Sequence, residues 1–315
     1  MMIDISNILS QIHAIPQDST LYLIERLPNG TGLFVSNGNV LYLVPNQEGC
    51  ASLSIKTEFL HLETNVFVSA FNASVSSFEN GYYNTVELQM SDSNETEGNL
   101  SAFVNLCFSH ASYMQGQEFM QFFDSLVALF QLPKEQHYKN LIGLVGELML
   151  IEYIFINNSM DLSSYWHTDG STSRLDFVCP FANLEVKTTA SNSLRFTIKH
   201  DQLFSVADKN YLIAIVLEES NAGRTLEEII TGLLDSPDYC NGLLFSINLE
   251  KEKRRVSPIE AKHKRFVLRK VYAYPASNIN PFGDIPDCVE DMSYKIDLLP
   301  FKDIPIADIL PKLKL

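Results

Sequence analysis

A long apolar stretch in the middle of the chain constrains the fold more than any other feature. Residues 141–156, LIGLVGELMLIEYIFI, have the length of a helix and carry only two charges, Glu147 and Glu152. A helix that is apolar on nearly every side is buried in a core or crosses a membrane, and this run is too short to cross a bilayer. We therefore expect a buried helix of a soluble protein, covered by other elements.

The segments around this helix predict an α/β (α+β) core. A helical stretch at 118–130 comes first, and the buried helix is expected over 134–158. The elements predicted after it are strands at 175–178, 184–187 and 193–199, a helix from 201, a strand at 211–219 and a helix at 224–236. This order gives a small mixed sheet flanked by helices. Residues 242–250, the basic segment after them and 266–276 are predicted to return to β-structure.

The first third of the chain predicts a separate β-rich domain. Residues 1–115 hold short alternating apolar runs, up to LSAFVNLCF at 100–108, which are separated by turn-forming residues. The sequences at 29–32 and 36–39, NGTG and SNGN, are typical of tight hairpin turns. The character changes near residues 110–118, so we predict one domain over 1–115, for docking or specificity, and a second over 116–315.

Cysteine use and the N-terminus predict a cytoplasmic protein. The five cysteines are widely scattered and form no CxxC pair, which favours a reducing compartment. The first residues, MMIDISNILSQIHAI, include an acid and no basic region of the kind that opens a signal peptide.

Charge is distributed unevenly along the chain. The net charge is −15, which argues against non-specific nucleic-acid binding by the whole surface. Residues 251–270 nevertheless hold nine of the 23 Lys and Arg residues and two acids, so this segment carries +7 and the rest −22. The segment is either a solvated surface hairpin or a strip that contacts phosphates, in which case Lys253, Arg254 and Arg255 are contact candidates.

The predicted hairpin gathers charges that a purely structural hairpin does not need. In RLDFVCPFANLEVKTT, residues 174–189, Asp176 precedes the turn, and Glu185 and Lys187 share one face of the second strand. A surface ion-paired hairpin would explain this, but Glu147 adds a buried acid upstream, behind Gly143 and Gly146. Glycine costs about 1 kcal/mol relative to alanine inside a helix, so these two predict a close approach to the helix backbone. Glu147 itself needs a cation such as a neighbouring Lys or Arg, a metal, or a route to solvent.

Two carboxylates beside a lysine suit metal-assisted hydrolysis of a phosphodiester. Carboxylate oxygens are the ligands that Mg²⁺ prefers, with water and substrate phosphate filling the other positions. The lysine can orient or deprotonate the attacking water and offset the charge that develops on phosphorus.

These residues resemble the PD-(D/E)XK nuclease superfamily. The similarity rests on Glu147, the LDF that holds Asp176, and LEVK, which holds Glu185 and Lys187. It extends to GLVGEL at 143–148, Trp166, EVKTT and Gln202-Leu203, which resemble a subfamily found beside methyltransferase and ATPase genes in bacterial restriction or phage-defence cassettes. Leu175 stands where the superfamily name has proline.

The resemblance implies a role for each matched residue. Asp176, Glu185 and Glu147 would be metal ligands for Mg²⁺, with Mn²⁺ as the alternative cation. Lys187 would be the catalytic lysine, and Gln202 would be a polar catalytic residue near the phosphate. Arg195 would be a phosphate contact. Apart from the resemblance, Thr188 is a candidate substrate contact, although threonine is also common at strand ends for its β-propensity alone.

The function expected from these residues is a Mg²⁺-dependent DNA endonuclease of a restriction or anti-phage system. ATPase and methyltransferase partners would bring this acidic protein to DNA, with no membrane involved, and a homodimer stays open. Two alternatives stay open as well: a non-catalytic scaffold with the same fold, and a nuclease that acts on RNA or on branched repair intermediates.

Overall fold

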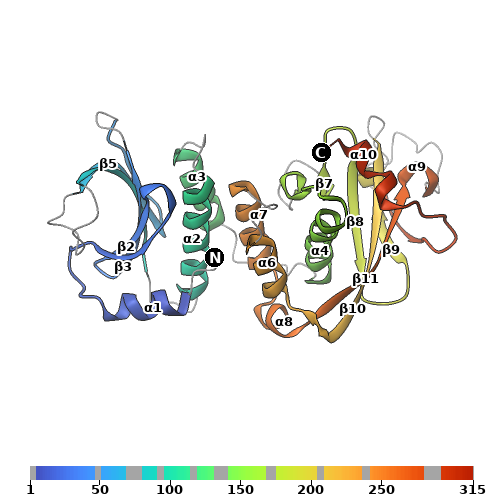
Figure 1. The fold of residues 1–315 in the computed structure, drawn as a ribbon, viewed down its shortest axis with the longest axis horizontal. Coiled ribbons are helices and arrows are strands. Elements are labelled where there is room, and N and C mark those ends of the chain that lie inside the picture. The colour runs from blue at the N-terminus through green and yellow to red at the C-terminus, as the bar shows by residue number, and fades with distance from the viewer. Residues whose placement is uncertain are drawn as a thin grey trace. The chain divides into compact units, whose positions relative to one another are not determined.

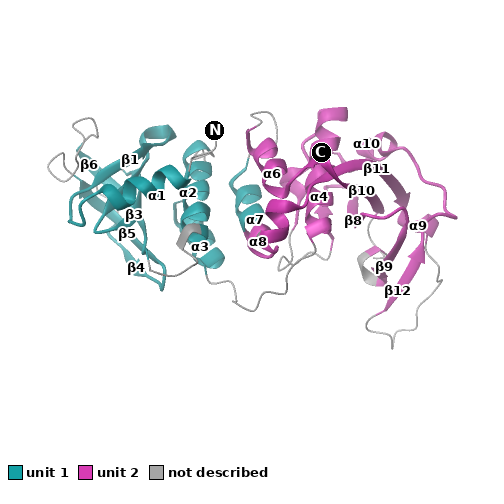
Figure 2. Ribbon diagram, turned by 90° about the horizontal axis from the view of Figure 1, so that it is seen from below, with its two compact units in different colours: residues 1–135, 242–250 teal, residues 136–241, 251–315 magenta. Residues whose placement is uncertain are grey.

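The chain forms two compact units in a computed structural model (Figure 2). Unit 1 comprises residues 1–135 and 242–250, and unit 2 comprises residues 136–241 and 251–315. The structure describes residues 5–46, 51–68, 80–90, 96–113, 119–130, 141–167, 175–203, 209–235, 242–279 and 292–314. The division into domains 1–115 and 116–315 stays a prediction; the units themselves place 119–130 and 242–250 with the N-terminal part.

Unit 1 is built on an antiparallel sheet of the order β1-β2-β3-β6-β5-β4 (Figure 1). Its strands are β1 (Tyr22–Arg26), β2 (Gly32–Ser36), β3 (Asn39–Pro45), β4 (Ser54–Lys56), β5 (Leu60–Val68) and β6 (Gly81–Leu88). The predicted turn at 36–39 is confirmed: Asn37 and Gly38 have φ of 51° and 77°, and Ser36 pairs with Asn39. Positive φ at both central residues is the conformation that Asn-Gly favours in two-residue hairpins.

Helices complete the core of unit 1. They are α1 (Ile5–Ala14), α2 (Thr96–Tyr113) and the predicted α3 (Phe119–Phe130). The prediction of a strand at 100–108 is wrong, because these residues lie in α2. Leu100, Phe103, Val104 and Cys107 are fully buried, and their spacing of three and four residues is that of one helix face.

Unit 2 contains the predicted mixed sheet. Its order is β11-β10-β8-β7, in which β8 and β10 are parallel and the other pairs are antiparallel. The predicted element order is confirmed over α4 (Leu141–Asn158), β7 (Phe177–Val178), β8 (Asn183–Thr189), β9 (Arg195–Lys199), α5 (His200–Leu203) and β10 (Asn210–Arg224). The later elements are α6 (Leu226–Asp235), α7 (Leu243–Arg254), α8 (Pro258–His263), β11 (Phe266–Pro275), α9 (Ala276–Ile279), β12 (Ser293–Asp297) and α10 (Leu310–Leu313).

Two sequence predictions for unit 2 need correction. The third predicted strand, β9, does not join the main sheet; it pairs with β12 in a separate two-stranded ribbon. Residues 242–250 alternate like a strand but form α7, which continues into the basic segment, and 258–263 form α8. The run of Glu, Lys and Arg that follows residue 249 consists of good helix formers, which outweigh the alternation.

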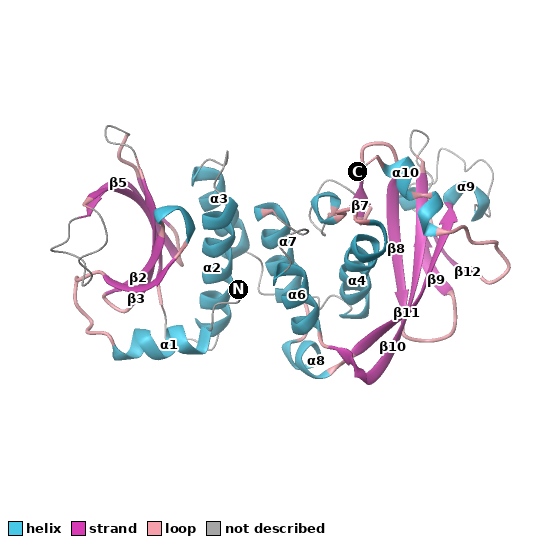
Figure 3. Ribbon diagram, viewed as in Figure 1, coloured by secondary structure: helices cyan, strands magenta, loops and turns pink. Residues whose placement is uncertain are grey.

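The main sheet is covered on both faces (Figure 3). Helix α4 packs on β8, α6 packs on α4, and α8 packs on α6. On the other face, side chains of β9, α5 and β12 form one apolar cluster with Leu212 and Ala214 of β10 and Tyr274 of β11. By length and apolar composition α4 could cross a membrane, but 56% of it is buried inside the protein. It is a core helix, as its all-round apolar sequence predicts.

Candidate active site

The register of the β7–β8 hairpin places Asp176 and Glu185 together. Phe177 pairs with Leu184 and Val178 with Asn183, so one further step of the antiparallel register puts Asp176 opposite Glu185. Residues directly opposite each other in an antiparallel pair point to the same face, with Cβ atoms about 5 Å apart. The two acids that the sequence singled out therefore lie at one point of the sheet.

Asp176 is held in place by both its backbone and its side chain. Its carbonyl accepts a hydrogen bond of 2.8 Å from the backbone N–H of His167. Its carboxylate Oδ2 accepts one of 2.7 Å from the backbone N–H of Val186. The Asp176 carboxylate thus accepts the hydrogen bond from Val186 that a backbone carbonyl would accept if β7 were longer. This fixes one carboxylate beside the residue that follows Glu185.

Glu185 and Lys187 form an ion pair on the same face of β8. Lys187 Nζ lies 2.5 Å from Glu185 Oε1. The Glu185 side chain is almost fully buried, at 2% exposed, whereas that of Lys187 is 23% exposed. A buried carboxylate needs a cation beside it, and Lys187 supplies one while still reaching solvent. The predicted same-face arrangement of the two residues is confirmed.

The sheet register extends this face to the neighbouring strands. Glu185 pairs with Leu212 of β10 and Lys187 with Ala214. Leu212 and Ala214 belong to the apolar cluster that includes Leu203 of α5. Helix α5, which carries Gln202, therefore lies on the face of Glu185 and Lys187. The Gln202 side chain is outside the described residues, so its catalytic role stays a prediction.

Glu147 lies on the opposite side of β8. Thr188, which alternates with Lys187 along the strand, points at α4: a Cβ built on Gly146 would lie 2.0 Å from Thr188 Oγ1. The predicted close approach to the helix backbone is confirmed at Gly146, and the approaching group is Thr188. At Gly143 it is wrong, because no described atom lies within 4 Å of a built Cβ. Thr188 is thus a packing contact of α4, away from the ion pair.

The partner of Glu147 is an indole. Trp166 Nε1 donates a hydrogen bond of 2.9 Å to Glu147 Oε2, and both residues are buried. Trp166 also forms a β-bridge with Phe177, so it continues the sheet beyond β7 and joins the hairpin to α4. From the sequence, Trp166 matches a family pattern and is expected as a loop aromatic that covers the edge of the site, whereas the structure buries it, at 2% exposed. A lone tryptophan in a polar segment was the available signal.

The donor set fits a divalent cation through two carboxylates. Within the described ranges, no group of three or more His, Cys, Asp or Glu side chains is placed to hold a metal ion. Mg²⁺ is usually bound through one or two carboxylates, with water and phosphate completing its shell. Asp176 and Glu185 meet that requirement, and Glu147, which is bonded to Trp166, does not join them. Its assignment as a third ligand stays a prediction.

The predicted substrate contact Arg195 lies on the ribbon of β9 and β12, and its contact with phosphate stays a prediction. The Arg195 side chain is 73% exposed on β9 and pairs with Asp297 of β12 at 2.9 Å. This bond, and then one from the Leu299 backbone N–H, lowers the pKa of Asp297.

The basic segment also lies elsewhere. Lys253 and Arg254 end α7, and Arg255 follows and donates a 3.0 Å bond to the buried carboxylate of Glu252. They precede α8, which packs on α6, on the side of the sheet that α4 covers. The structure does not bring them to the face of Glu185 and Lys187, and their phosphate contacts stay predictions.

Comparison with known proteins supports the geometry at the level of the family. The family model described as "Putative PD-(D/E)XK family member, (DUF4420)" matches residues 115–299, which is more than half of the chain. No curated protein and no solved structure matches. The matched range contains α4, the β7–β8 hairpin, α5 and β10.

Proposed function

The chain belongs to the DUF4420 family of PD-(D/E)XK proteins, and from this we propose that it is a Mg²⁺-dependent endonuclease that hydrolyses phosphodiester bonds of DNA. The family supports a phosphodiesterase in general. We infer three further points from the site residues: that the cation is Mg²⁺, that the substrate is DNA, and that cleavage occurs within a strand.

One observation carries the proposal: Asp176, Glu185 and Lys187 meet on one face of the sheet, at the point where the short strand β7 begins beside β8. β7 has two residues and β8 has seven, so β8 continues past its neighbour at this point. The Lys187 side chain reaches solvent there. A phosphate group can therefore approach the lysine without entering the core.

Asp176 and Glu185 are the residues that would hold the cation. PD-(D/E)XK nucleases typically use divalent metals, and such an ion lowers the pKa of a bound water and offsets phosphate charge. The hydrogen bond from Val186 fixes the Asp176 carboxylate in advance. The burial of Glu185 strengthens its interaction with any nearby cation, because the local dielectric constant is lower than that of water.

Lys187 acts on the reacting phosphate and its nucleophile. Its ammonium can donate hydrogen bonds to a water that attacks phosphorus and to a phosphate oxygen on which negative charge grows. In the structure it donates to Glu185, which keeps the amine at the carboxylates while it waits for substrate. Both roles require the flexible stem and point charge of a lysine.

We also propose a setting for this activity. The net charge of −15 disfavours unaided binding along DNA, so ATPase and methyltransferase partners in a cytoplasmic restriction or phage-defence system would deliver it.

Cleavage of a supercoiled plasmid and of labelled oligonucleotide duplexes, with Mg²⁺ or Mn²⁺, tests the proposal. Asp176→Asn and Glu185→Gln keep the side-chain shape but remove the charge that binds the cation. Each should abolish detectable cleavage and weaken Mn²⁺ binding followed by its electron paramagnetic resonance signal. Unchanged Mn²⁺ binding in both variants would contradict the assigned ligands. If the wild-type protein cuts no DNA, either alone or with added cell extract, the result would favour a non-catalytic scaffold.

A further inference from the structure

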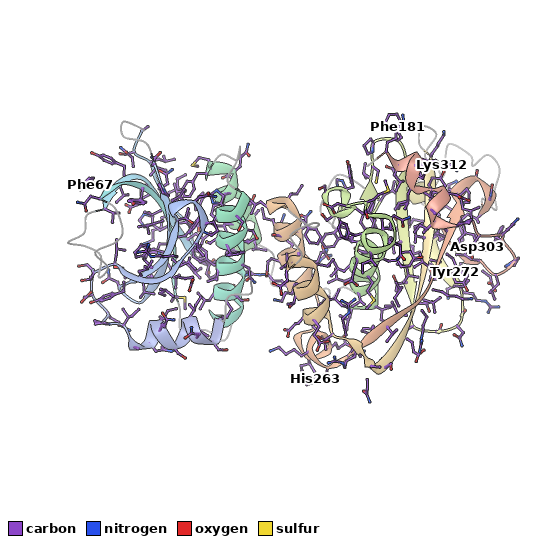
Figure 4. All side chains as sticks on the ribbon, in the orientation of Figure 1. Phe67, Phe181, His263, Tyr272, Asp303 and Lys312 are labelled. Atoms are coloured by element: carbon purple, nitrogen blue, oxygen red, sulfur yellow. The ribbon has the colours of Figure 1, made fainter. Side chains whose placement is uncertain are left out.

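Three segments of unit 2 meet at the turn of the β7–β8 hairpin. The Asn183 backbone N–H donates a 3.0 Å bond to the Lys209 carbonyl, and Tyr211 pairs with Leu184. The third segment is the end of the chain around α10. Lys312 Nζ lies 5.9 Å from the ring centroid of Tyr211, and Lys314 Nζ lies 3.8 Å from that of Phe181. Figure 4 shows the labelled Phe181 and Lys312 at the same end of this unit.

These segments carry three exposed lysines on an acidic chain. Residues 179–183, 209–211 and 309–314 contain three lysines, and Asp208 and Asp308 directly precede the last two segments, whereas the whole chain carries −15. Lys209, Lys312 and Lys314 are all exposed. We call Phe181 and these three lysines the tip patch. Its charge is complementary to phosphate.

Phe181 points outward although Cys179 and Ala182 of the same turn are buried. Cys179 and Ala182 are 6% and 2% exposed, and Phe181 is 58% exposed. The Lys314 ammonium lies over the ring, yet more than half of the residue still faces solvent. Phe67 in unit 1 is similarly exposed, at 54%, but its ring packs edge-on against Tyr82 with centroids 5.3 Å apart. An exposed phenylalanine among lysines is the combination that binds single-stranded nucleic acid, in which bases stack on the ring and phosphates meet the cations.

We infer that the tip patch binds an unpaired segment of the DNA substrate next to the bond that is cut. This inference rests on the proposed nuclease function. Bases of a duplex are already stacked on one another, so an exposed ring gains a stacking partner only from an unpaired base. Strand β8 runs from Asn183 at the patch to Glu185 and Lys187, two and four residues further, or roughly 7 and 13 Å. One DNA strand can therefore contact both, which favours substrates with a single-stranded tail or flap over blunt duplexes.

Fluorescence anisotropy of three labelled DNA probes tests the inference: a blunt duplex, the same duplex with an oligo(dT) tail, and the oligo(dT) strand alone. The buffer contains EDTA, so that no probe is cut and binding does not depend on the metal site. The wild-type protein should bind the tailed duplex about tenfold more tightly than the blunt one. Phe181→Ala should remove that preference, and the matched control Phe67→Ala should keep it. Lys312→Gln with Lys314→Gln should flatten the salt dependence for oligo(dT) by about 0.7 per lost phosphate contact, and Lys56→Gln on the exposed strand β4 should leave it unchanged.

The outcomes separate this inference from the proposed function. An active nuclease that does not prefer the tail, or that keeps its preference in Phe181→Ala, overturns the inference and leaves the function intact. A Phe181-dependent preference in a protein that cuts no DNA supports the patch and contradicts the nuclease. Circular dichroism of each variant checks the fold, which the exposed positions of these side chains should preserve.

Discussion

One buried polar pair from each unit shows two different ways of burying polar side chains. In unit 1, the Tyr42 hydroxyl and His110 Nδ1 share a 2.9 Å hydrogen bond, and the imidazole stacks on Phe122 with centroids 4.3 Å apart. Burial lowers the pKa of His110 to about 4, so the pair is neutral at pH 7. In unit 2, the buried carboxylate of Glu185 is paired with the Lys187 ammonium, which reaches solvent.

This difference separates a structural polar pair from one suited to chemistry. A neutral hydrogen bond inside an aromatic core costs little to bury once it is satisfied. A charged pair often costs more to bury than it returns in stability, so the Glu185–Lys187 pair fits a site that uses its charges. The comparison predicts that substitutions at Lys187 lower activity with little effect on stability. Substitutions at His110 should change stability with little effect on activity.

The largest expected effect comes from removing the lysine of unit 2. Lys187→Ala should lower the cleavage rate by about 10²–10⁴-fold, because the variant loses a group that acts on the attacking water and the phosphate. Lys56→Ala, on an exposed strand of unit 1, is the matched control and should cleave at the wild-type rate. Single-turnover cleavage with saturating protein measures both. Wild-type activity in Lys187→Ala would mean that the Glu185–Lys187 pair is only structural, like the Tyr42–His110 pair of unit 1.

The second prediction concerns the pH dependence of unit 1. The pKa of His110 is about 4 in the folded protein against 6.5 for an unperturbed histidine. The unfolded state therefore binds more protons between these values, so this contribution is complete above pH 6.5 and is lost as pH falls toward 4. The loss is about 3 kcal/mol in the free energy of unfolding. Urea unfolding followed by circular dichroism from pH 7.5 to 4.5 measures it.

His110→Phe supplies the control, because it keeps a ring against Phe122 and removes the titrating group. Its unfolding should depend less on pH than that of the wild type. Trp166, the only tryptophan of the chain, reports on unit 2, and the substitution should not alter its fluorescence at any pH. An equal loss of stability in His110→Phe and wild type would show that His110 does not carry the effect.

The sequence predicts the site of unit 2 better than the fold of unit 1. Alternation around the hairpin correctly placed Glu185 and Lys187 on one face, because a strand has a strict period of two. At 100–108 an apolar run fits a strand as well as a helix, and the packing of Leu100 and Phe103 decided for the helix. Glu147 shows a different limit. Its position along the sequence indicates that it is buried, but only the tertiary contact with Trp166 reveals its partner.

The contact between α4 and β8 gives a third, smaller effect. Gly146→Ala would place a Cβ 2.0 Å from Thr188 Oγ1, and such overpacking costs about 1–3 kcal/mol. Gly143→Ala, one turn earlier in the same helix, meets no described atom within 4 Å and should stabilise the protein by up to about 1 kcal/mol. Thermal unfolding followed by Trp166 fluorescence compares the two. Equal melting temperatures would mean that α4 does not pack on Thr188 as closely as the structure shows.

The smallest effect is expected at Arg195, and it tests whether charge alone marks a working residue in unit 2. Arg195 and Asp297 form an ion pair on the exposed ribbon, and exposed pairs contribute little to stability. Arg195→Ala should change the melting temperature by less than about 2 °C. Because Asp297 already pairs with Arg195, we expect the salt dependence of duplex binding to stay at its wild-type value.

Arg269, which pairs with Glu218 on the surface of the same unit, supplies the control. Arg195→Ala and Arg269→Ala should be indistinguishable in melting temperature. Flattening of the salt dependence by nearly one unit in Arg195→Ala would confirm its predicted phosphate contact. The DNA path would then extend over the ribbon, and an exposed ion pair of unit 2 would join the buried one as a part of the site.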